Sequence, residues 1–251
     1  MITLADAARE FGIALTPEQQ QSFDVYYREL IAWNARMNLT AITEHDQVVV
    51  KHFLDSLSVL PVLRATPVTA LHPERSGAKS KDAIHLIDIG TGAGFPGIPL
   101  KIALPDLRLT LLETTGKKVE FLKHMIEQLH LKDTIAIQAR AEDLGRDPLH
   151  REQYDVAVAR AVAKLATLAE YTLPFVRIGG VFIAQKGVDV DEEMRQAERA
   201  LRVLGGRVRE TVSVELPGLE PRHLIVVEKI AATPASFPRR AGIPERLPLT
   251  N

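Results

Sequence analysis

Four glycines fall within the eight residues from Gly90 to Gly97, in the stretch LIDIGTGAGFPGIPL. An apolar run typical of a buried strand precedes them, and a segment typical of a helix follows. Glycine allows a sharp backbone turn and keeps side chains away from its amide groups, which can then bind a ligand directly. We therefore expect a ligand to lie against this turn. A tight turn without a ligand is the alternative.

The glycine turn fits two overlapping ligand-binding patterns. From Gly92 to Gly97 it fits G-x-G-x-x-G, which is typical of dinucleotide sites. From Asp88 onward it fits D-x-G-x-G-x-G, the first motif of S-adenosylmethionine-dependent methyltransferases, with glycines at Gly90, Gly92 and Gly94. A pyrophosphate requires that no negative charge lies nearby, whereas the sulfonium and ammonium of adenosylmethionine suit the carboxylate of Asp88. The pattern favours the methyl donor and leaves NAD as the alternative ligand.

A second carboxylate, Glu113, ends the next apolar run and follows Gly94 by 19 residues. A carboxylate at that place in a doubly wound sheet can accept the ribose hydroxyls of either ligand. Glu113 therefore supports a nucleoside ligand without separating the two candidates. An exposed charge at a strand end is its other interpretation.

The elements that position these residues follow from short apolar runs. Most of the runs are almost continuously apolar, as in strands buried on both faces of a sheet, and helical segments such as KKVEFLKHMIEQLHL separate them. Strand and helix thus alternate as in a parallel, doubly wound α/β sheet. The last two runs are joined only by PGLEP, which predicts a hairpin and an antiparallel edge. The runs are residues 83–90, 107–113, 134–139, 154–160, 181–187, 207–216 and 222–230.

The chain before this alternating part is predicted to be helical. Thr16, Pro17 and Gln19 form a helix start with a capping box, and an apolar stripe follows it. Residues 44–60 give a second amphipathic helix. The predicted organisation is a helical extension (1–60), a polar, proline-containing connector (61–82), a catalytic domain (83–230) and a basic, proline-containing C-terminal arm (231–251).

Composition excludes several kinds of site. The 251 residues contain no cysteine, which excludes thiolate zinc sites, iron–sulfur clusters and cysteine nucleophiles. The net charge of -1 excludes a uniformly basic surface but allows a local basic face. No apolar run approaches the ~18 residues of a membrane span, and no long exposed apolar stripe remains for a partner. We expect a monomeric, cytoplasmic protein that binds neither a membrane nor a metal.

Seven distinctive motifs cover nearly the whole chain: WNARMNLTAI (33–42), KHFLDSL (51–57), DIGTGAGFPGIPL (88–100), RAEDL (140–144), ARAVAKL (159–165), RHLIVVEK (222–229) and FPRRAGIPERLPL (237–249). With them the chain resembles the bacterial small-subunit ribosomal RNA guanine-N7 methyltransferases, the family also called glucose-inhibited division protein B. The resemblance implies a class-I, Rossmann-like methyltransferase fold with a seven-stranded sheet. It also implies methyl transfer from S-adenosyl-L-methionine to N7 of a guanine, guanine 527, in 16S ribosomal RNA of the small ribosomal subunit.

The resemblance further implies a set of cofactor contacts at the ends of the first four predicted strands. The connector before Ile84 is longer than in relatives, and ETTG after the second strand departs from the family's pattern. Together with the glycine motif, the predicted cofactor-binding residues are Asp88, Gly90, Gly92, Gly94, Phe95, Glu113, Thr114, Thr115, Ala141, Glu142 and Arg160. An NAD-dependent oxidoreductase and a non-catalytic RNA-binding assembly factor remain the alternative functions.

Methylation at guanine N7 needs no general base, because N7 carries an in-plane lone pair and no proton and can attack a methyl group in line. The sequence lacks the cysteine that pyrimidine C5 methylation requires. ARAVAK also stands where an Asn/Asp-Pro-Pro-aromatic motif would mark amine methylation. Arg160 in this segment is the predicted catalytic residue, since a guanidinium there can hold a phosphate or guanine O6 and stay charged. A solvated arginine is the alternative.

Polar residues outside these motifs leave two questions open. Basic residues on later strand ends and in the arm are predicted contacts to the RNA backbone; they are Lys164, Lys186, Arg222, His223, Arg239 and Arg240. The C-terminal arm either binds RNA or packs on the domain. His52, Asp55 and Ser56 share one helix face, and Asn34 and Asn38 share another. These five residues face the methyl-transfer cleft or cap nearby loops, and we favour the structural role.

Overall fold

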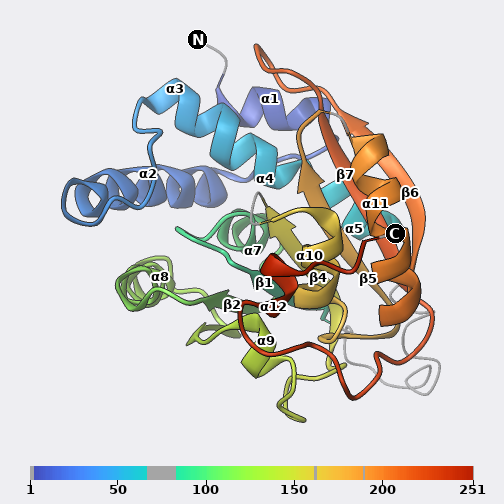
Figure 1. Cartoon of the computed structure of the whole chain (residues 1–251). Coiled ribbons are helices and arrows are strands. Elements are labelled where there is room, and N and C mark those ends of the chain that lie inside the picture. The colour runs from blue at the N-terminus through green and yellow to red at the C-terminus, as the bar shows by residue number, and fades with distance from the viewer. Residues whose placement is uncertain (1–2, 67–82, 161–162, 189, 251) are drawn as a thin grey trace, which may run out of the picture.

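A seven-stranded sheet lies at the centre of the protein in the computed structural model, which describes residues 3–66, 83–160, 163–188 and 190–250 (Figure 1). The strands are β1 (His85–Ile89), β2 (Arg108–Glu113), β3 (Thr134–Gln138), β4 (Tyr154–Arg160), β5 (Val176–Lys186), β6 (Gly206–Val214) and β7 (Arg222–Lys229). Their order is β3-β2-β1-β4-β5-β7-β6. Strands β1 to β5 pair in parallel, whereas β7 is antiparallel to both β5 and β6. The predicted fold class and its antiparallel edge are confirmed.

The strand order places the predicted site at one edge of the sheet. Strand β2 lies on one side of β1 and β4 lies on the other. Open α/β sheets bind ligands outside the carboxyl ends of the strands at such a switch point. Asp88, Glu113 and Arg160 lie at or next to the carboxyl ends of β1, β2 and β4. The fold therefore brings these three side chains to the same edge.

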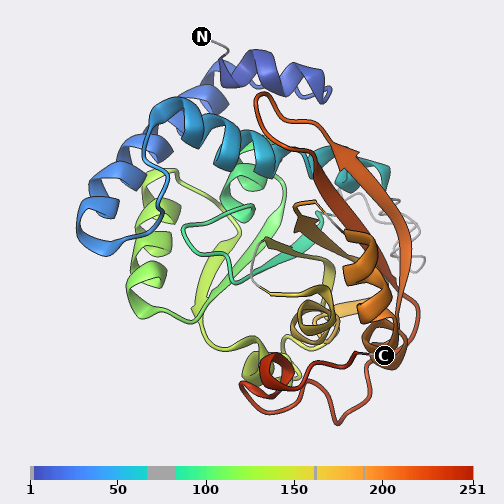
Figure 2. The ribbon, with the colours of Figure 1, turned by 45° about the horizontal axis from the view of Figure 1, so that its top comes forward.

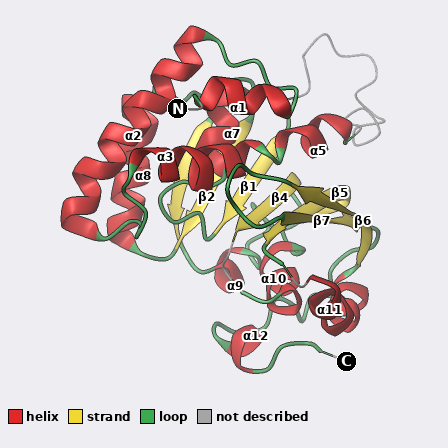
Figure 3. Ribbon diagram, turned by 90° about the horizontal axis from the view of Figure 1, so that it is seen from above, coloured by secondary structure: helices red, strands yellow, loops and turns green. Residues whose placement is uncertain are grey.

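Helices cover both faces of the sheet, as Figure 3 shows. Helices α7, α8 and the N-terminal extension cover one face, and α9, α10, α11 and α12 lie on the other. Each layer encloses its own apolar core, so the strands are buried on both faces and read as continuous apolar runs. Within the described ranges, no helix is long and apolar enough to cross a membrane. The helix bounds are α7 (Gly97–Ala103), α8 (Gly116–Gln128), α9 (Ala141–Leu144), α10 (Leu165–Thr172), α11 (Val190–Leu204) and α12 (Ile243–Arg246).

The N-terminal extension is helical and packs on α7 and α8 (Figure 2). The predicted capping box of Thr16 and Gln19 is present. The extension continues to Ala65, beyond the predicted boundary at residue 60, because Pro61 lies in the first turn of a helix, where its missing amide costs no hydrogen bond. Residues 67–82 of the predicted connector lie outside the described residues. The elements are α1 (Leu4–Glu10), α2 (Pro17–Met37), α3 (His45–Val48), the π-helix η1 (Val49–Leu54), α4 (Asp55–Leu57) and α5 (Leu60–Ala65).

The C-terminal arm packs on the domain, and RNA binding by its exposed residues stays a prediction. Arg151 donates hydrogen bonds to the carbonyls of Thr233 at 2.6 Å and Phe237 at 2.8 Å. The Thr167 hydroxyl donates to the Pro244 carbonyl at 3.2 Å. The arm thus runs along α9 and α10, forms the short helix α12 and continues to α11, where Arg199 donates a hydrogen bond to the Thr250 carbonyl (Figure 1).

Candidate active site

The glycines of the turn differ in what surrounds them. Gly92 has a φ of +61°, and a Cβ placed there would meet no atom within 4 Å, so this part of the turn is open to a ligand. At Gly94, where φ is +102°, a Cβ would lie 2.6 Å from the hydroxyl of Tyr26. Protein atoms therefore exclude a side chain at Gly94. Only part of the glycine turn is kept clear for a ligand.

Asp88 lies beneath the turn and is fully buried, which corrects the prediction that it contacts the ligand. Its Oδ2 accepts hydrogen bonds from the Thr91 hydroxyl at 2.6 Å and from the Gly97 amide at 2.8 Å. Gly97 makes room for this carboxylate, since a Cβ there would lie 2.9 Å from Oδ2. Burial raises the pKa of Asp88 to about 6, although both hydrogen bonds act to lower it. Asp88 shapes the turn and can affect a ligand only through it.

The carboxylate of Glu113 is fixed by backbone amides. Its Oε1 accepts hydrogen bonds from the amides of Thr114 and Thr115, both at 2.9 Å. Its Oε2 accepts one from the Gly92 amide at 3.1 Å. A carboxylate oxygen has about two acceptor positions, so Oε2 retains one for a ligand while Oε1 is occupied. Glu113 can therefore accept one ribose hydroxyl at Oε2, rather than two hydroxyls side by side.

A cavity of about 320 Å³ collects six of the predicted cofactor residues, and we call it the cofactor cavity. Its charged lining residues are two carboxylates, Glu113 and Glu142, and three cations, Lys118, Arg140 and Arg160. The Oε1 of Glu142 accepts a hydrogen bond from the Gly242 amide at 2.8 Å, so the C-terminal arm helps to fix this wall. The lining residues are Ile89, Gly90, Leu112, Glu113, Thr114, Lys118, Ala139, Arg140, Ala141, Glu142, Arg160 and Tyr171.

The N-terminal extension holds the guanidinium of Arg160. Its Nη1 donates hydrogen bonds to the Lys51 carbonyl at 3.1 Å and to Asp55 Oδ2 at 3.0 Å. The guanidinium also lies 5.0 Å from the centre of the Phe95 ring, within cation–π range. Phe95 is buried and is absent from the lining of the cofactor cavity, so its ring supports Arg160. The interpretation of Arg160 as a solvated arginine is wrong, because its side chain is 16% exposed and its Nη1 is held by Asp55 and the Lys51 carbonyl.

His52 completes the surroundings of Arg160. Its ring stacks on Phe95 with the centroids 4.5 Å apart, and its Nδ1 lies 3.3 Å from Arg160 Nη2. Burial and the positive charge of Arg160 lower the pKa of His52 to about 4, so the ring is neutral at neutral pH. π-Helical turns such as η1, which carries His52, often occur at functional sites. His52 and Asp55 both contact Arg160, as the cleft-facing alternative expects. His52 also holds a loop in place, as the favoured structural role expects, since its Nε2 lies 2.8 Å from the Thr40 hydroxyl.

Arg160 also lines a second cavity, of about 280 Å³, which we call the basic cavity. Its cations come from η1, β4, β5 and β7. Gln185 lies beside Arg160 in the register of β4 and β5, and its Nε2 donates to the Asp55 carbonyl at 2.8 Å. Of the described lining residues, only Arg160 is shared by the two cavities. The basic cavity is lined by Ile42, Lys51, His52, Asp55, Arg160, Gln185, Lys186, Gly187 and Arg222.

Four of the predicted RNA contacts remain available for that role. Lys164 and Arg240 are exposed, and Arg222 and His223 are half-buried. Within the described part of the chain, Arg222 Nε and His223 Nδ1 are buried without a hydrogen-bond partner. Arg222 lines the basic cavity, whereas His223 does not.

Two predicted RNA contacts are corrected by internal ion pairs. Lys186 Nζ lies 2.6 Å from Glu193 and also donates to the Ala163 carbonyl at 2.6 Å. Arg239 makes a bidentate pair with Glu170, 2.7 Å at its closest, and Glu170 is 1% exposed. The charge of each cation is already neutralised by a carboxylate of the same chain, Glu193 on α11 for Lys186 and Glu170 on α10 for Arg239.

The remaining helix-face residues have the structural roles that we favoured. Asn34 Oδ1 accepts a hydrogen bond from the Thr40 amide at 2.9 Å. Asn38 ends α2 in a left-handed conformation with φ of 51°. The Ser56 hydroxyl donates to the His52 carbonyl at 2.6 Å, within the same helix. These contacts shape the extension without touching Arg160.

Several lining residues were not predicted from the sequence. Lys51, Gln185, Lys118 and Arg140 line one of the two cavities. Lys51 and Arg140 stand within motifs and Lys118 and Gln185 do not, and nothing in residue type or spacing separates any of them from an ordinary surface residue. The end position of Gln185 on β5, next to the end of β4, is the signal that could have indicated it.

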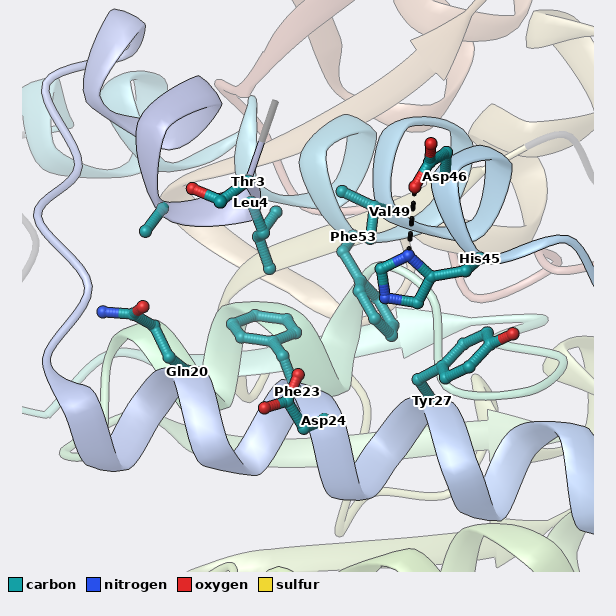
Figure 4. Close-up of a pocket in the computed structure, with 11 residues that line it drawn as sticks. Thr3, Leu4, Gln20, Phe23, Asp24, Tyr27, His45, Asp46, Val49 and Phe53 are labelled. Atoms are coloured by element: carbon teal, nitrogen blue, oxygen red, sulfur yellow. Dashed lines mark hydrogen bonds and ion pairs between the residues drawn. The ribbon is translucent and has the colours of Figure 1, made fainter. Parts of the chain in front are cut away.

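A third cavity, of about 280 Å³, lies inside the extension between α1, α2 and α3 (Figure 4). Phe23, Tyr27 and Phe53 point into it, and His45 pairs with Asp46 at its rim, 3.1 Å apart. It includes none of the predicted site residues, and we assign it no role in catalysis.

Comparisons with known proteins decide between the alternative functions. The sequence profile described as GidB, rRNA small subunit methyltransferase G, matches residues 19–225. The chain belongs to the GidB family. It is 49% identical over 249 residues to the ribosomal RNA small subunit methyltransferase G of Roseiflexus sp. (strain RS-1), covering 99% of this chain and 100% of the relative. The protein of the same name from Roseiflexus castenholzii is 48% identical over 249 residues, with the same coverage.

A solved structure supports the fold alone. TrmN from Thermus thermophilus superposes with a TM-score of 0.50 at 16% identity, covering 72% of this chain and 53% of that one. Membership in the GidB family confirms the predicted enzyme class, an S-adenosylmethionine-dependent rRNA methyltransferase, and with it the cofactor. It supports neither the NAD-dependent oxidoreductase nor the non-catalytic assembly factor.

Proposed function

We propose that this GidB-family enzyme methylates N7 of a guanine in 16S ribosomal RNA, guanine 527 by family resemblance, with the methyl donor in the cofactor cavity and the guanine in the basic cavity. The observation that carries the proposal is that Arg160 lines both cavities. In-line transfer requires that donor and acceptor meet at about 3 to 3.5 Å. A residue shared by the two cavities marks the place where they can meet.

The residues of the cofactor cavity fit adenosylmethionine. Glu113 Oε2 has an acceptor position left for a ribose hydroxyl, and the open surface of Gly92 lies beside it, since its amide donates to the same oxygen. The lining combines the carboxylates of Glu113 and Glu142 with the cations of Lys118, Arg140 and Arg160, so charge alone does not separate a cationic donor from a pyrophosphate. Membership in the GidB family favours adenosylmethionine. When bound, adenosylmethionine supplies an electrophilic methyl group on its sulfonium.

The residues of the basic cavity suit an RNA guanine that is methylated without a base. His52 is neutral, with a pKa of about 4, and lies against Arg160, while Asp55 is paired with Arg160. Neither is needed to remove a proton, since N7 has none. Arg160 can donate a hydrogen bond to guanine O6 and leave N7 unbonded for attack. Lys51 and Arg222 add positive charge for the phosphates beside the base.

The test is the position of the transferred methyl group. The protein is incubated with labelled adenosylmethionine and small ribosomal subunits from a strain that lacks the family's enzyme, and the 16S RNA is digested and analysed by mass spectrometry. We expect 7-methylguanosine in the fragment that contains guanine 527. A label on another atom or in another fragment would overturn the proposal. The absence of any label, although the protein binds the donor, would also overturn it. Arg207→Ala, on the distant edge strand β6, serves as the matched control variant and should methylate normally.

A further inference from the structure

The hydroxyl of Tyr26 reaches from the N-terminal extension to the glycine turn. Tyr26 lies in the middle of α2 and is fully buried. Its hydroxyl donates a hydrogen bond to the Ala93 carbonyl at 2.5 Å. Ala93 lies between Gly92, which is open to a ligand, and Gly94. One side chain of the extension is therefore bonded directly to the backbone of the turn.

The ring of Tyr26 is fixed as firmly as its hydroxyl. It stacks on Phe95 with centroids 5.3 Å apart and an interplanar angle of 20°, and Phe53 lies 5.3 Å away on η1. Burial raises the pKa of Tyr26 well above its ordinary value, so the hydroxyl remains a hydrogen-bond donor at any working pH. His52 stacks on the same Phe95 ring, and the guanidinium of Arg160 lies over it. The aromatic stack joins the turn to the residue shared by both cavities.

Gly94 shows that the turn and this hydroxyl are fitted to each other. A Cβ at Gly94 would come within 2.6 Å of Tyr26 Oη and 2.5 Å of Ile98 Cδ1. The other ties of the turn, from Asp88 and Glu113, come from strands β1 and β2 of the sheet itself. Tyr26 adds a hydrogen bond to the turn from the N-terminal extension, which lies outside the sheet.

We propose that Tyr26 is a positioning residue of the methyltransferase, whose hydroxyl holds the glycine turn in the conformation that binds the methyl donor. The proposal rests on the proposed function in placing the donor over this turn. It gives the N-terminal extension a part in cofactor binding, in addition to its part in holding Arg160. Without the hydroxyl, the turn would have to be ordered when the donor binds, and the ordering would weaken donor affinity.

The test is Tyr26→Phe, which removes the hydroxyl and keeps the ring. We expect the Kd for adenosylhomocysteine, measured by calorimetry, to rise about fivefold to tenfold, the size expected for one lost hydrogen bond. The KM for adenosylmethionine should rise similarly, while kcat at saturating donor and the Kd for small subunits stay within about twofold. Tyr27→Phe is the matched control, because the Tyr27 hydroxyl bonds to the Thr43 carbonyl away from the turn.

A second measurement separates positioning from general loss of stability. The amides of Gly94 and Phe95 bond to the Thr91 carbonyl at 2.9 and 3.0 Å, and their hydrogen exchange reports the conformation of the turn. We expect Tyr26→Phe to speed their exchange more than that of the Lys118 amide on α8. Ile13→Val, which removes one buried methyl group elsewhere in the extension, should lower the Tm without changing donor affinity.

The outcomes distinguish this inference from the proposed function. If a folded Tyr26→Phe variant binds adenosylhomocysteine and exchanges its turn amides like the wild type, while Glu113→Gln weakens binding, the role of Tyr26 is refuted alone. If neither variant changes donor affinity, the donor does not lie on the turn, and the proposed function falls as well.

Discussion

The cofactor cavity and the basic cavity lie at the same edge of the sheet but are assembled in different ways. The cofactor cavity takes most of its lining from segments that follow β1, β2 and β3, between residues 89 and 142. The basic cavity combines η1 with the ends of β4, β5 and β7, from Ile42 to Arg222. The proposed donor site is therefore built mainly from local motifs on a common fold. The acceptor site depends on how the N-terminal extension docks onto that fold.

This difference predicts that substitutions separate into two classes. Changes in the cofactor cavity should weaken donor binding and leave RNA binding intact. Changes in the basic cavity should weaken RNA binding and leave donor binding intact. Arg160 lines both cavities and is the exception.

The largest effect is expected for Arg160→Ala. Loss of the guanidinium at the border of the cavities should lower kcat/KM for methyl transfer at least about a hundredfold, since it removes a charged hydrogen-bond donor from the reacting base. Donor affinity should stay within about tenfold, as measured by calorimetry with adenosylhomocysteine.

The control for Arg160→Ala tests the effect of the Asp55 carboxylate, which loses its ion-pair partner in this variant. Asp55 is 8% exposed at its side chain and loses its partner in this variant, which can destabilise the fold. Arg160→Ala combined with Asp55→Asn removes that charge, and should be equally inactive but more stable. A collapse of donor binding in both variants would assign Arg160 to the cofactor instead.

Glu113→Gln should act on the donor alone. The change removes the charge that binds the ribose hydroxyl at Oε2, and a hydrogen bond to a charged group is worth about 1.5 to 3 kcal/mol. We expect the Kd for adenosylhomocysteine to rise about tenfold to a hundredfold, while filter binding of small subunits is unchanged. Weaker RNA binding would contradict the separation of the two cavities.

His52, which lines the basic cavity, should make the free energy of unfolding sensitive to acid. Its pKa is about 4 in the folded protein, below the ordinary histidine value of 6.5, so the folded state binds fewer protons between these values and stability is lost as the pH falls through them. Relative to His52→Asn, the wild type should lose about 1 to 2 kcal/mol of unfolding free energy between pH 6.5 and 5 in urea titrations.

Asp88 also titrates in this pH range, so the effect of His52 has to be measured as the difference between the wild type and His52→Asn. Burial raises the pKa of Asp88 to about 6, so the contribution of Asp88 to the free energy of unfolding falls as the pH rises from about 4 to 6. This change is opposite in sign to the change expected from His52. Both proteins contain Asp88, and its effect cancels in the difference. Equal pH profiles for wild type and His52→Asn would refute the neutral, buried histidine.

The smallest effect is expected for Arg222→Ala. Arg222 is half-buried at the basic cavity, and its Nε has no partner in the described chain. The Kd for small subunits should rise a few-fold, and the slope of its salt dependence should fall by about one charge. Donor affinity should not change. Lys186→Ala is the comparison variant, because its charge is already paired with Glu193 and should contribute little to the salt slope.

The local features of the site could be predicted from the sequence. The glycine turn, Glu113 and the alternation of strands are encoded in contiguous residues, and the structure places them as expected. Partners that are distant in sequence could not be predicted in this way. Arg239 was expected to contact RNA, and nothing near it in the sequence indicates Glu170, 69 residues away, as its partner.

Two further differences have specific physical reasons. Pro61 was interpreted as the start of a connector, but a proline in the first helical turn is compatible with a helix, and α5 continues to Ala65. The structural role was favoured for His52 and Asp55, because helix spacing shows only that they share a face. Which element that face meets is decided by docking of the extension, which brings it to Arg160.

A crystal structure with adenosylhomocysteine tests the central claim most directly. We predict that its ribose bonds to Glu113 Oε2 in the cofactor cavity and that its sulfur faces Arg160 and the basic cavity. Adenosylhomocysteine in the basic cavity, or bound away from both Glu113 and Arg160, would contradict the assignment of donor and acceptor to these two cavities.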